Sequence, residues 1–124
     1  MIRRGWQLLG WVGVALTLAI SLGPPALDEG SGHADKFVHL AGYSVLMFWW
    51  SQLVMQRRWR LALAVILYGL LIEGLQGLTP DRQADAADAL ANTSGVLLGW
   101  LAARLVPNLP AQLAALPALQ RLRL

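Results

Sequence analysis

The chain has 124 residues, of which 56% are hydrophobic and 14% are charged, and its net charge is +3. Soluble domains carry roughly 25% charged residues, and a small domain needs proportionally more polar surface than a large one. These values exclude a soluble globular domain, and the high apolar content excludes an intrinsically disordered chain. The sequence contains no cysteine, which excludes a disulfide framework, a thiolate metal site and a cysteine nucleophile.

Four apolar segments are long enough to cross a bilayer as helices, because a hydrocarbon core of roughly 30 Å needs about 20 apolar residues. The expected spans are residues 6–22, 37–55, 61–78 and 86–106. The sequence therefore predicts an all-α integral membrane bundle of four transmembrane helices, forming a single domain over residues 1–124. The leucine-rich residues 107–124 are expected to form an interfacial amphipathic tail.

The first span has two interpretations, because Arg3 and Arg4 precede it as they would in a signal peptide. An Ala-x-Ala-like cleavage site does not follow, and Pro24-Pro25 stand where one would be expected. An uncleaved transmembrane helix is therefore favoured.

Basic residues predict the orientation of the bundle, because loops rich in lysine and arginine stay in the cytoplasm. Eight of the ten basic residues fall on one side of the predicted membrane: Arg3, Arg4, Arg57, Arg58, Arg60, Arg104, Arg121 and Arg123. Both termini should therefore be cytoplasmic, in the inner or plasma membrane of a bacterium. The basic residues then indicate topology and contact with membrane lipids, and no nucleic-acid partner is expected.

The acidic residues collect on the opposite side. All seven are expected on outer loops or at outer helix ends: Asp28, Glu29, Asp35, Glu73, Asp81, Asp85 and Asp88. Glu73 lies inside the third span, where a carboxylate is costly unless it faces the bundle, water or a partner. This distribution predicts a polar extracytoplasmic surface.

Polar residues recur at helical spacing in the outer halves of three spans, so that each helix carries them on one face. These faces should converge, because none of them can face lipid. The candidate ligand-binding residues are Asp35, Lys36, His39, Tyr43, Glu73, Gln76, Arg82, Asp85, Asp88 and Asn92. No paired-histidine spacing supports a metal site, and no metal or cofactor is expected. Gly95 and Gly99 suit a close helix contact, either within the chain or in a homo-oligomer.

Three interpretations of this polar surface remain open. The first is an outward-facing pocket that binds or modulates a lipid-linked or amphiphilic molecule of the envelope, with Lys36 and Arg82 holding its anionic group. The second is an integral-membrane enzyme acting on a lipid-linked substrate, with His39 as acid or base beside Glu73 or Asp85. The third is a structural network that only builds the bundle, with Asn92 bridging helices.

The order and spacing of these residues resemble the VanZ-like family of small membrane proteins. The resemblance covers residues 35–104 and is carried by the pattern Asp35-Lys36-x-x-His39-x-x-x-Tyr43, Glu73-x-x-Gln76 and Arg82-x-x-Asp85-x-x-Asp88-x-x-x-Asn92-x-x-Gly95. The family takes its name from a protein associated with low-level resistance to teicoplanin, a lipoglycopeptide antibiotic. The resemblance implies a helical membrane protein and a cell-envelope role in which a glycopeptide is a possible partner, but it brings no settled biochemical activity.

Overall fold

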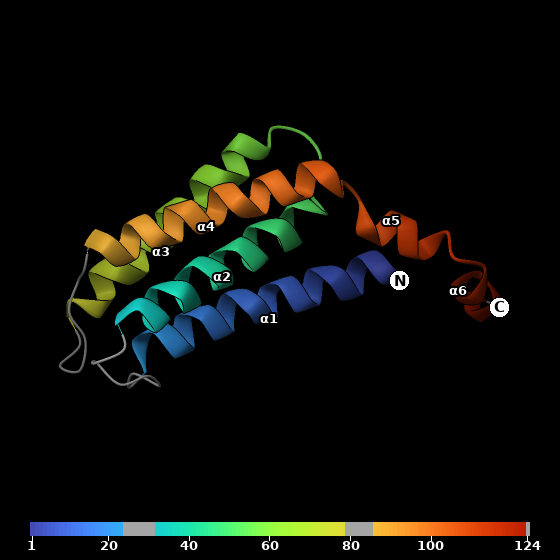
Figure 1. Cartoon of the computed structure of the whole chain (residues 1–124). Helices are drawn as coiled ribbons and strands as arrows, with labels where there is room; N and C mark the ends of the chain where they lie inside the picture. The colour runs from blue at the N-terminus through green and yellow to red at the C-terminus, as the bar shows by residue number, and fades with distance from the viewer. Residues whose placement is uncertain (24–31, 79–85, 124) are drawn as a thin grey trace.

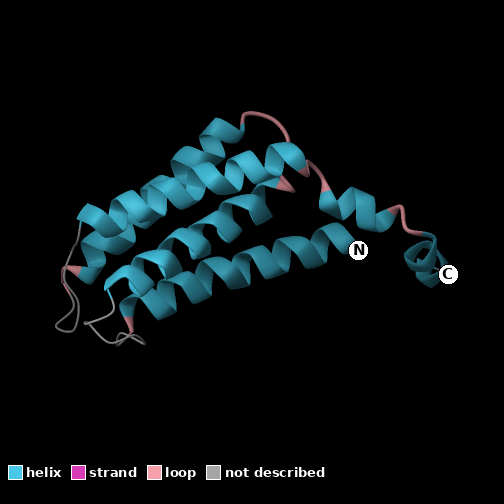
Figure 2. Ribbon diagram, viewed as in Figure 1, coloured by secondary structure: helices cyan, strands magenta, loops and turns pink. Residues whose placement is uncertain are grey.

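The computed structural model is all-helical in the part of the chain that it describes, residues 1–23, 32–78 and 86–123. Four long helices are followed by two short ones and a single 3-10 turn (Figures 1 and 2). Their bounds are α1 Ile2–Leu22, α2 Gly32–Ser51, α3 Arg58–Gln76, α4 Ala86–Leu105, α5 Leu109–Ala114, α6 Pro117–Gln120 and η1 Arg121–Arg123. The all-α prediction and its four long helices are confirmed.

The long helices lie side by side as a bundle with two distinct ends (Figure 1). One end holds the last turns of α1 and α3 and the first turns of α2 and α4. The other end holds the N-terminus, the turn between α2 and α3, and the passage from α4 into α5 and α6. We call these the loop end and the terminal end. The C-terminal segment continues past the terminal end instead of folding back over the four helices.

Three parts of the described chain are long and apolar enough to cross a membrane: Ile2–Leu22, Arg58–Gln76 and Ala86–Gln120, the last of which contains α4. The expected span at residues 37–55 corresponds to α2, which has the required length of 20 residues. Its first half carries polar and charged residues that lower its mean hydropathy, and it is not among the three. The chain is thus a helical membrane protein with several candidate spans.

The bounds of α2 differ from the expected 37–55 at both ends. The helix starts five residues earlier, at Gly32, because its polar first turns are helical as well. It stops at Ser51, where the Arg58 guanidinium donates a hydrogen bond to the Ser51 carbonyl oxygen at 2.6 Å. Arg57 has a left-handed backbone (φ 55°) and turns the chain into α3. Local polar contacts, and not hydropathy, therefore set the end of α2.

Helices α2 and α4 form the closest pair, and glycines make the contact possible. A Cβ atom on Gly95 would meet the Leu40 carbonyl oxygen and lie 3.1 Å from the Ser44 nitrogen. Met47 and Val96, both fully buried, fill the interior beside this contact. The predicted close approach at Gly95 and Gly99 is therefore made within the chain, and small residues let two membrane helices pack backbone to backbone.

Helix α1 is held to α2 and α3 by hydrogen bonds from side chains to backbone carbonyl oxygens. The Tyr68 hydroxyl donates to the Val14 carbonyl oxygen at 2.6 Å. Trp6 and Trp49 stack with their ring centroids 3.8 Å apart, and each indole N–H donates to the other residue's carbonyl oxygen, at 2.9 and 2.8 Å. A membrane interior offers no water to such groups, so these bonds fix the position of α1.

Candidate functional site

The loop end of the bundle gathers polar side chains from three helices. Seven of the predicted residues are described there, and we call them the polar cluster: Lys36, His39, Tyr43, Glu73, Gln76, Asp88 and Asn92. They come from residues 36–43 of α2, the last turn of α3 and the first half of α4, and the ends of these helices meet at this end (Figure 1). The helical spacing therefore brings these residues to one end of the bundle.

An ion pair joins α2 to α4 at the rim of the cluster. Lys36 Nζ lies 3.1 Å from Asp88 Oδ1. The side chain of Lys36 is 38% exposed, whereas that of Asp88 is 12% exposed. The pair thus has a buried anion near the first turn of α4, where the helix dipole favours negative charge, and a cation that is partly open to its surroundings.

One turn further into the bundle, a second hydrogen bond repeats the α2–α4 connection. His39 Nδ1 lies 3.0 Å from Asn92 Oδ1. An amide oxygen only accepts, so Nδ1 is the donor in this pairing. The expectation that Asn92 bridges two helices is met by this bond, whose partner at Nδ1 is an amide and not a carboxylate.

Tyr43 and Glu73 form the deep part of the cluster, with exposed fractions of 4% and 6%. Gly69, one turn before Glu73, leaves room for the tyrosine ring: a Cβ on Gly69 would lie 3.1 Å from Tyr43 Cε1. Within the described part of the chain the Tyr43 hydroxyl is buried without a hydrogen-bond partner. A buried hydroxyl of this kind keeps an unused hydrogen-bond donor.

Gln76 has a structural role in addition to its place in the cluster. Its side-chain nitrogen donates to the Ser21 carbonyl oxygen at 2.9 Å and so ties the end of α3 to the last turn of α1. Carbonyls in the last turn of a helix have no partner within the helix, and Gln76 satisfies one of them. Gln76 therefore anchors α1, which carries no member of the cluster, to α3.

Three predicted site residues cannot be placed in this geometry. Arg82 and Asp85 lie outside the described residues, and Asp35 belongs to α2 but its side chain is not described. Among the side chains of residues 1–23, 36–78 and 86–122, there is no group of three histidine, aspartate or glutamate residues placed to hold a metal ion. The assignment of ligand-binding and catalytic roles to any of these residues stays a prediction.

Sequence reasoning assigned only topology to Arg58, which is the centre of a second polar network at the terminal end. Its guanidinium donates to the carbonyl oxygens of Ser51, Val54, Ala103 and Pro107. Beside it, the fully buried Gln52 side chain donates to the Val106 carbonyl oxygen at 2.8 Å and accepts from the Leu109 amide at 2.7 Å. This network connects the C-terminal ends of α2 and α4.

The signal for this second network was present in the sequence but ambiguous. Arg58 stands in a run of basic residues, and a basic loop reads first as a topology marker. Gln52 lies inside the predicted span 37–55, and its hydrogen-bond partners are backbone groups 54 and 57 residues away. Contacts of a side chain to distant backbone leave no spacing that a single sequence could show.

The fold and the cluster define a helical membrane protein with a polar cluster at the loop end of its bundle and a second polar network at the terminal end. Residues 6–107 match the family model described as VanZ/LLP1. The chain belongs to the VanZ/LLP1 family, as the resemblance of residues 35–104 implied. Among curated proteins and among solved structures, the comparisons found no match to the chain.

Proposed function

We propose that the polar cluster opens to the extracytoplasmic side of the membrane and binds the anionic headgroup of a cell-envelope amphiphile through Lys36. The observation that carries this proposal is the asymmetry of the Lys36–Asp88 pair, in which the lysine is 38% exposed and the aspartate 12%. An incoming anion can therefore reach the ammonium group and compete with Asp88 for it.

The interior of the cluster supports the same proposal. Behind Lys36, the deep residues Tyr43 and Asn92 offer a hydroxyl and an amide. These groups are neutral and can donate to oxygen atoms of a headgroup. Lys36 supplies the attraction and the deeper residues the hydrogen bonds, a common division of roles between charge and fixed donors in ligand sites.

The binding test uses two substitutions with opposite expected effects. The protein is purified in a mild detergent and titrated with phosphatidylglycerol, and the lipid adduct is quantified by native mass spectrometry. Lys36→Gln should weaken binding about fivefold, since a partly exposed charge contact contributes on the order of 1 kcal/mol. Asp88→Asn should strengthen binding, because it removes the carboxylate that competes with the ligand for Lys36.

The control is Arg60→Gln at the terminal end, which removes one positive charge from an exposed residue beside Trp59. It should leave the adduct unchanged if binding takes place at the cluster. A purely structural network predicts a different pattern, in which Lys36→Gln and Asp88→Asn both lower the thermal unfolding temperature and neither alters lipid binding. That pattern would reject the proposal.

The proposed orientation can be tested by cysteine labelling, because the natural chain has no cysteine. Leu78 is exposed at the loop end and Leu122 is exposed near the C-terminus. In intact spheroplasts a membrane-impermeant maleimide should label Leu78→Cys and leave Leu122→Cys unlabelled until the cells are lysed. The reverse labelling would place the cluster in the cytoplasm and remove its access to extracytoplasmic ligands.

A role in glycopeptide resistance follows from the same site, since teicoplanin is an amphiphile that acts at the outer membrane face. Cells expressing the chain should tolerate more teicoplanin than cells with the empty vector, and Lys36→Gln should abolish the difference. Equal sensitivity of all three strains, with normal expression, would separate lipid binding from resistance and reject the resistance role.

A further inference from the structure

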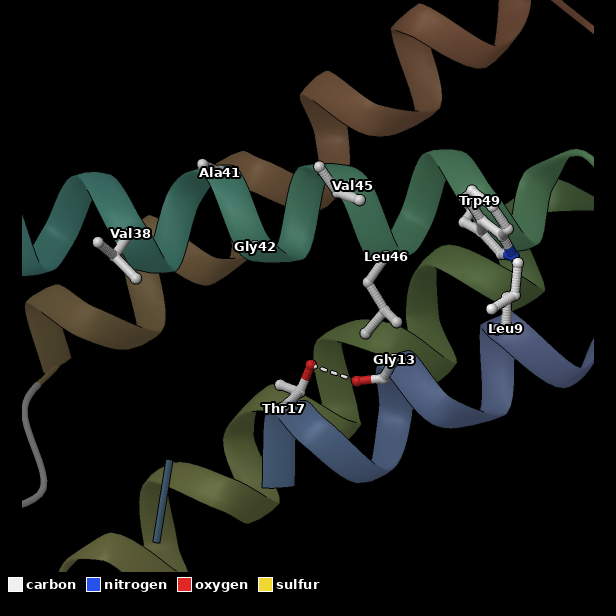
Figure 3. Close-up of a pocket in the computed structure, with 10 residues that line it drawn as sticks. Leu9, Gly13, Thr17, Val38, Ala41, Gly42, Val45, Leu46 and Trp49 are labelled. Atoms are coloured by element: carbon white, nitrogen blue, oxygen red, sulfur yellow. Dashed lines mark hydrogen bonds between the residues drawn. The ribbon is translucent and has the colours of Figure 1, made fainter. Parts of the chain in front are cut away.

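A groove lies between α1 and α2 (Figure 3). Its volume is about 580 Å³, and its floor is made of small residues that include Gly13 and Gly42. Branched side chains that are more than half exposed, among them Val38 and Val45, form its walls. The groove is thus a hollow lined by residues of both helices.

The polar groups in the lining of this groove are already satisfied. Thr17, the hydroxyl-bearing residue, donates to the Gly13 carbonyl oxygen at 2.7 Å (Figure 3). The Trp49 indole N–H donates to the Trp6 carbonyl oxygen at 2.8 Å. The donors of these two side chains are therefore already used, and a lining that is otherwise apolar suits an apolar occupant.

The length of the groove matches one leaflet of a bilayer. Its lining runs along α2 from Val38 to Trp49, which is about 16 Å at 1.5 Å per residue. Half of a hydrocarbon core of roughly 30 Å is about 15 Å. Val38 stands only two residues, or about 3 Å, below Lys36 in depth. The groove and the charged rim of the cluster therefore lie at similar depth but on different sides of α2, since Val38 lines the groove against α1 whereas Lys36 pairs with Asp88 of α4.

The polar cluster and the groove lie on adjacent faces of α2. His39, Gly42 and Leu46 follow at i, i+3 and i+7, so the face that carries His39 continues into the groove lining. We propose that the α1–α2 groove holds one acyl chain of the amphiphile whose anionic headgroup Lys36 binds. This inference rests on the proposed function and makes its ligand a lipid with a long saturated or unsaturated chain.

Gly42 allows the groove to be filled without disturbing the fold. A Cβ on Gly42 would meet no atom within 4 Å, and a Cβ on Gly13 would meet only Leu46 Cδ1, at 3.7 Å. Gly42→Leu should therefore fold normally, and leucine is a better helix former than glycine. Gly74 of α3 has the same open surroundings away from the groove, so Gly74→Leu is the matched control.

The experiment measures adducts of dioleoyl phosphatidylglycerol and of its single-chain lyso form by native mass spectrometry of the full chain in detergent. Gly42→Leu should weaken both adducts about tenfold, which corresponds to about 1.4 kcal/mol, while Gly74→Leu binds as the natural chain does. Ala41→Leu, on the same lining, should act like Gly42→Leu. Thermal unfolding temperatures of all three variants should equal or exceed that of the natural chain.

The outcomes separate this inference from the proposed function. Wild-type binding by Gly42→Leu, together with weakened binding by Lys36→Gln, would reject the groove and leave the headgroup site standing. Weakened binding by Gly42→Leu with no effect of Lys36→Gln would keep the chain in the groove and reject the headgroup site. If Gly42→Leu converted a dimer into a monomer without changing the lipid adduct, the groove would be an interface between two copies and the acyl-chain inference would be wrong.

Discussion

Gly99 of α4 lies directly against the backbone of Ser44 in α2. A Cβ atom on Gly99 would meet the Ser44 carbonyl oxygen, and it would lie 2.9 Å from Met47 Cβ and 3.1 Å from the Phe48 nitrogen. None of these neighbours is the flexible end of a side chain, so none can move aside cheaply. The spacing of α2 and α4, and with it the register of the two helices that make the Lys36–Asp88 pair, depends on this absence of a side chain.

Gly99→Ala should therefore destabilise the bundle by about 1–3 kcal/mol, the usual cost of forcing extra atoms into a packed interior. The measurement is thermal unfolding in detergent micelles, followed by far-ultraviolet circular dichroism. Gly74→Ala is the control, because a Cβ there meets nothing within 4 Å. It should raise stability by up to about 1 kcal/mol through helix propensity. Equal stability of the two variants would show that the α2–α4 contact is looser than described.

The four long helices could be predicted from sequence because bilayer thickness and proline positions constrain them strongly. The pattern of Asp88, Asn92, Gly95 and Gly99 also predicted one polar-to-small face on α4, and that face does contact α2. Helical spacing determines which residues of one helix share a face, and membrane burial then forces such faces together. These two constraints were enough to select the members of the polar cluster.

The pairing of residues within the cluster could not be predicted in the same way. From the sequence, several acidic residues at the same depth were possible partners for Lys36. Its contact with Asp88 depends on how α2 is rotated and spaced against α4. The groove between α1 and α2 could not be predicted either, because Gly13 and Gly42 of its lining are ordinary small residues within apolar segments. Both features arise from how two helices meet, which no single segment encodes.

The two tyrosines of the bundle give opposite expectations when their hydroxyl groups are removed. Tyr43→Phe deletes a buried hydroxyl that has no hydrogen-bond partner in the described part of the chain, so stability should stay equal or rise by up to about 1 kcal/mol. Tyr68→Phe deletes the donor to the Val14 carbonyl oxygen and should cost about 1 kcal/mol. The unfolding free energy of each variant in detergent gives the answer.

The same pair of variants also tests the role of Tyr43 in the proposed site. If a headgroup oxygen accepts from the Tyr43 hydroxyl, Tyr43→Phe should weaken the phosphatidylglycerol adduct while the fold is unharmed. Tyr68→Phe, whose hydroxyl is already used by α1, should bind as the natural chain does. A large loss of stability in Tyr43→Phe would instead show that its hydroxyl has a structural partner.

Arg58 should not tolerate even a conservative change. Its planar guanidinium reaches carbonyl oxygens at the ends of both α2 and α4, including those of Ser51 at 2.6 Å and Pro107 at 2.8 Å. A lysine ammonium is a single point and cannot span this set of acceptors. Arg58→Lys should lower the unfolding free energy by about 2 kcal/mol, in the range of hydrogen bonds to charged groups.

Arg57→Lys is the matched control for Arg58, since Arg57 is exposed and adjacent in sequence. Both substitutions keep the positive charge that sets membrane topology, so a difference between them reports the carbonyl contacts alone. The comparison is again made by thermal unfolding. A stability loss of the same size in both variants would assign the effect to arginine in the loop generally and remove Arg58 from the role of a helix-end anchor.

Arg57 itself is placed at a strained backbone position, with φ 55° and ψ 44° immediately before α3. A left-handed conformation costs a residue with a Cβ about 1–2 kcal/mol, and glycine avoids most of that cost. Arg57→Gly should therefore raise the unfolding free energy by about 1 kcal/mol once the larger entropy of glycine in the unfolded chain is included. Arg60→Gly, inside α3, should instead lower it by about 1 kcal/mol. If both substitutions destabilise the protein equally, the chain does not turn into α3 through a left-handed Arg57.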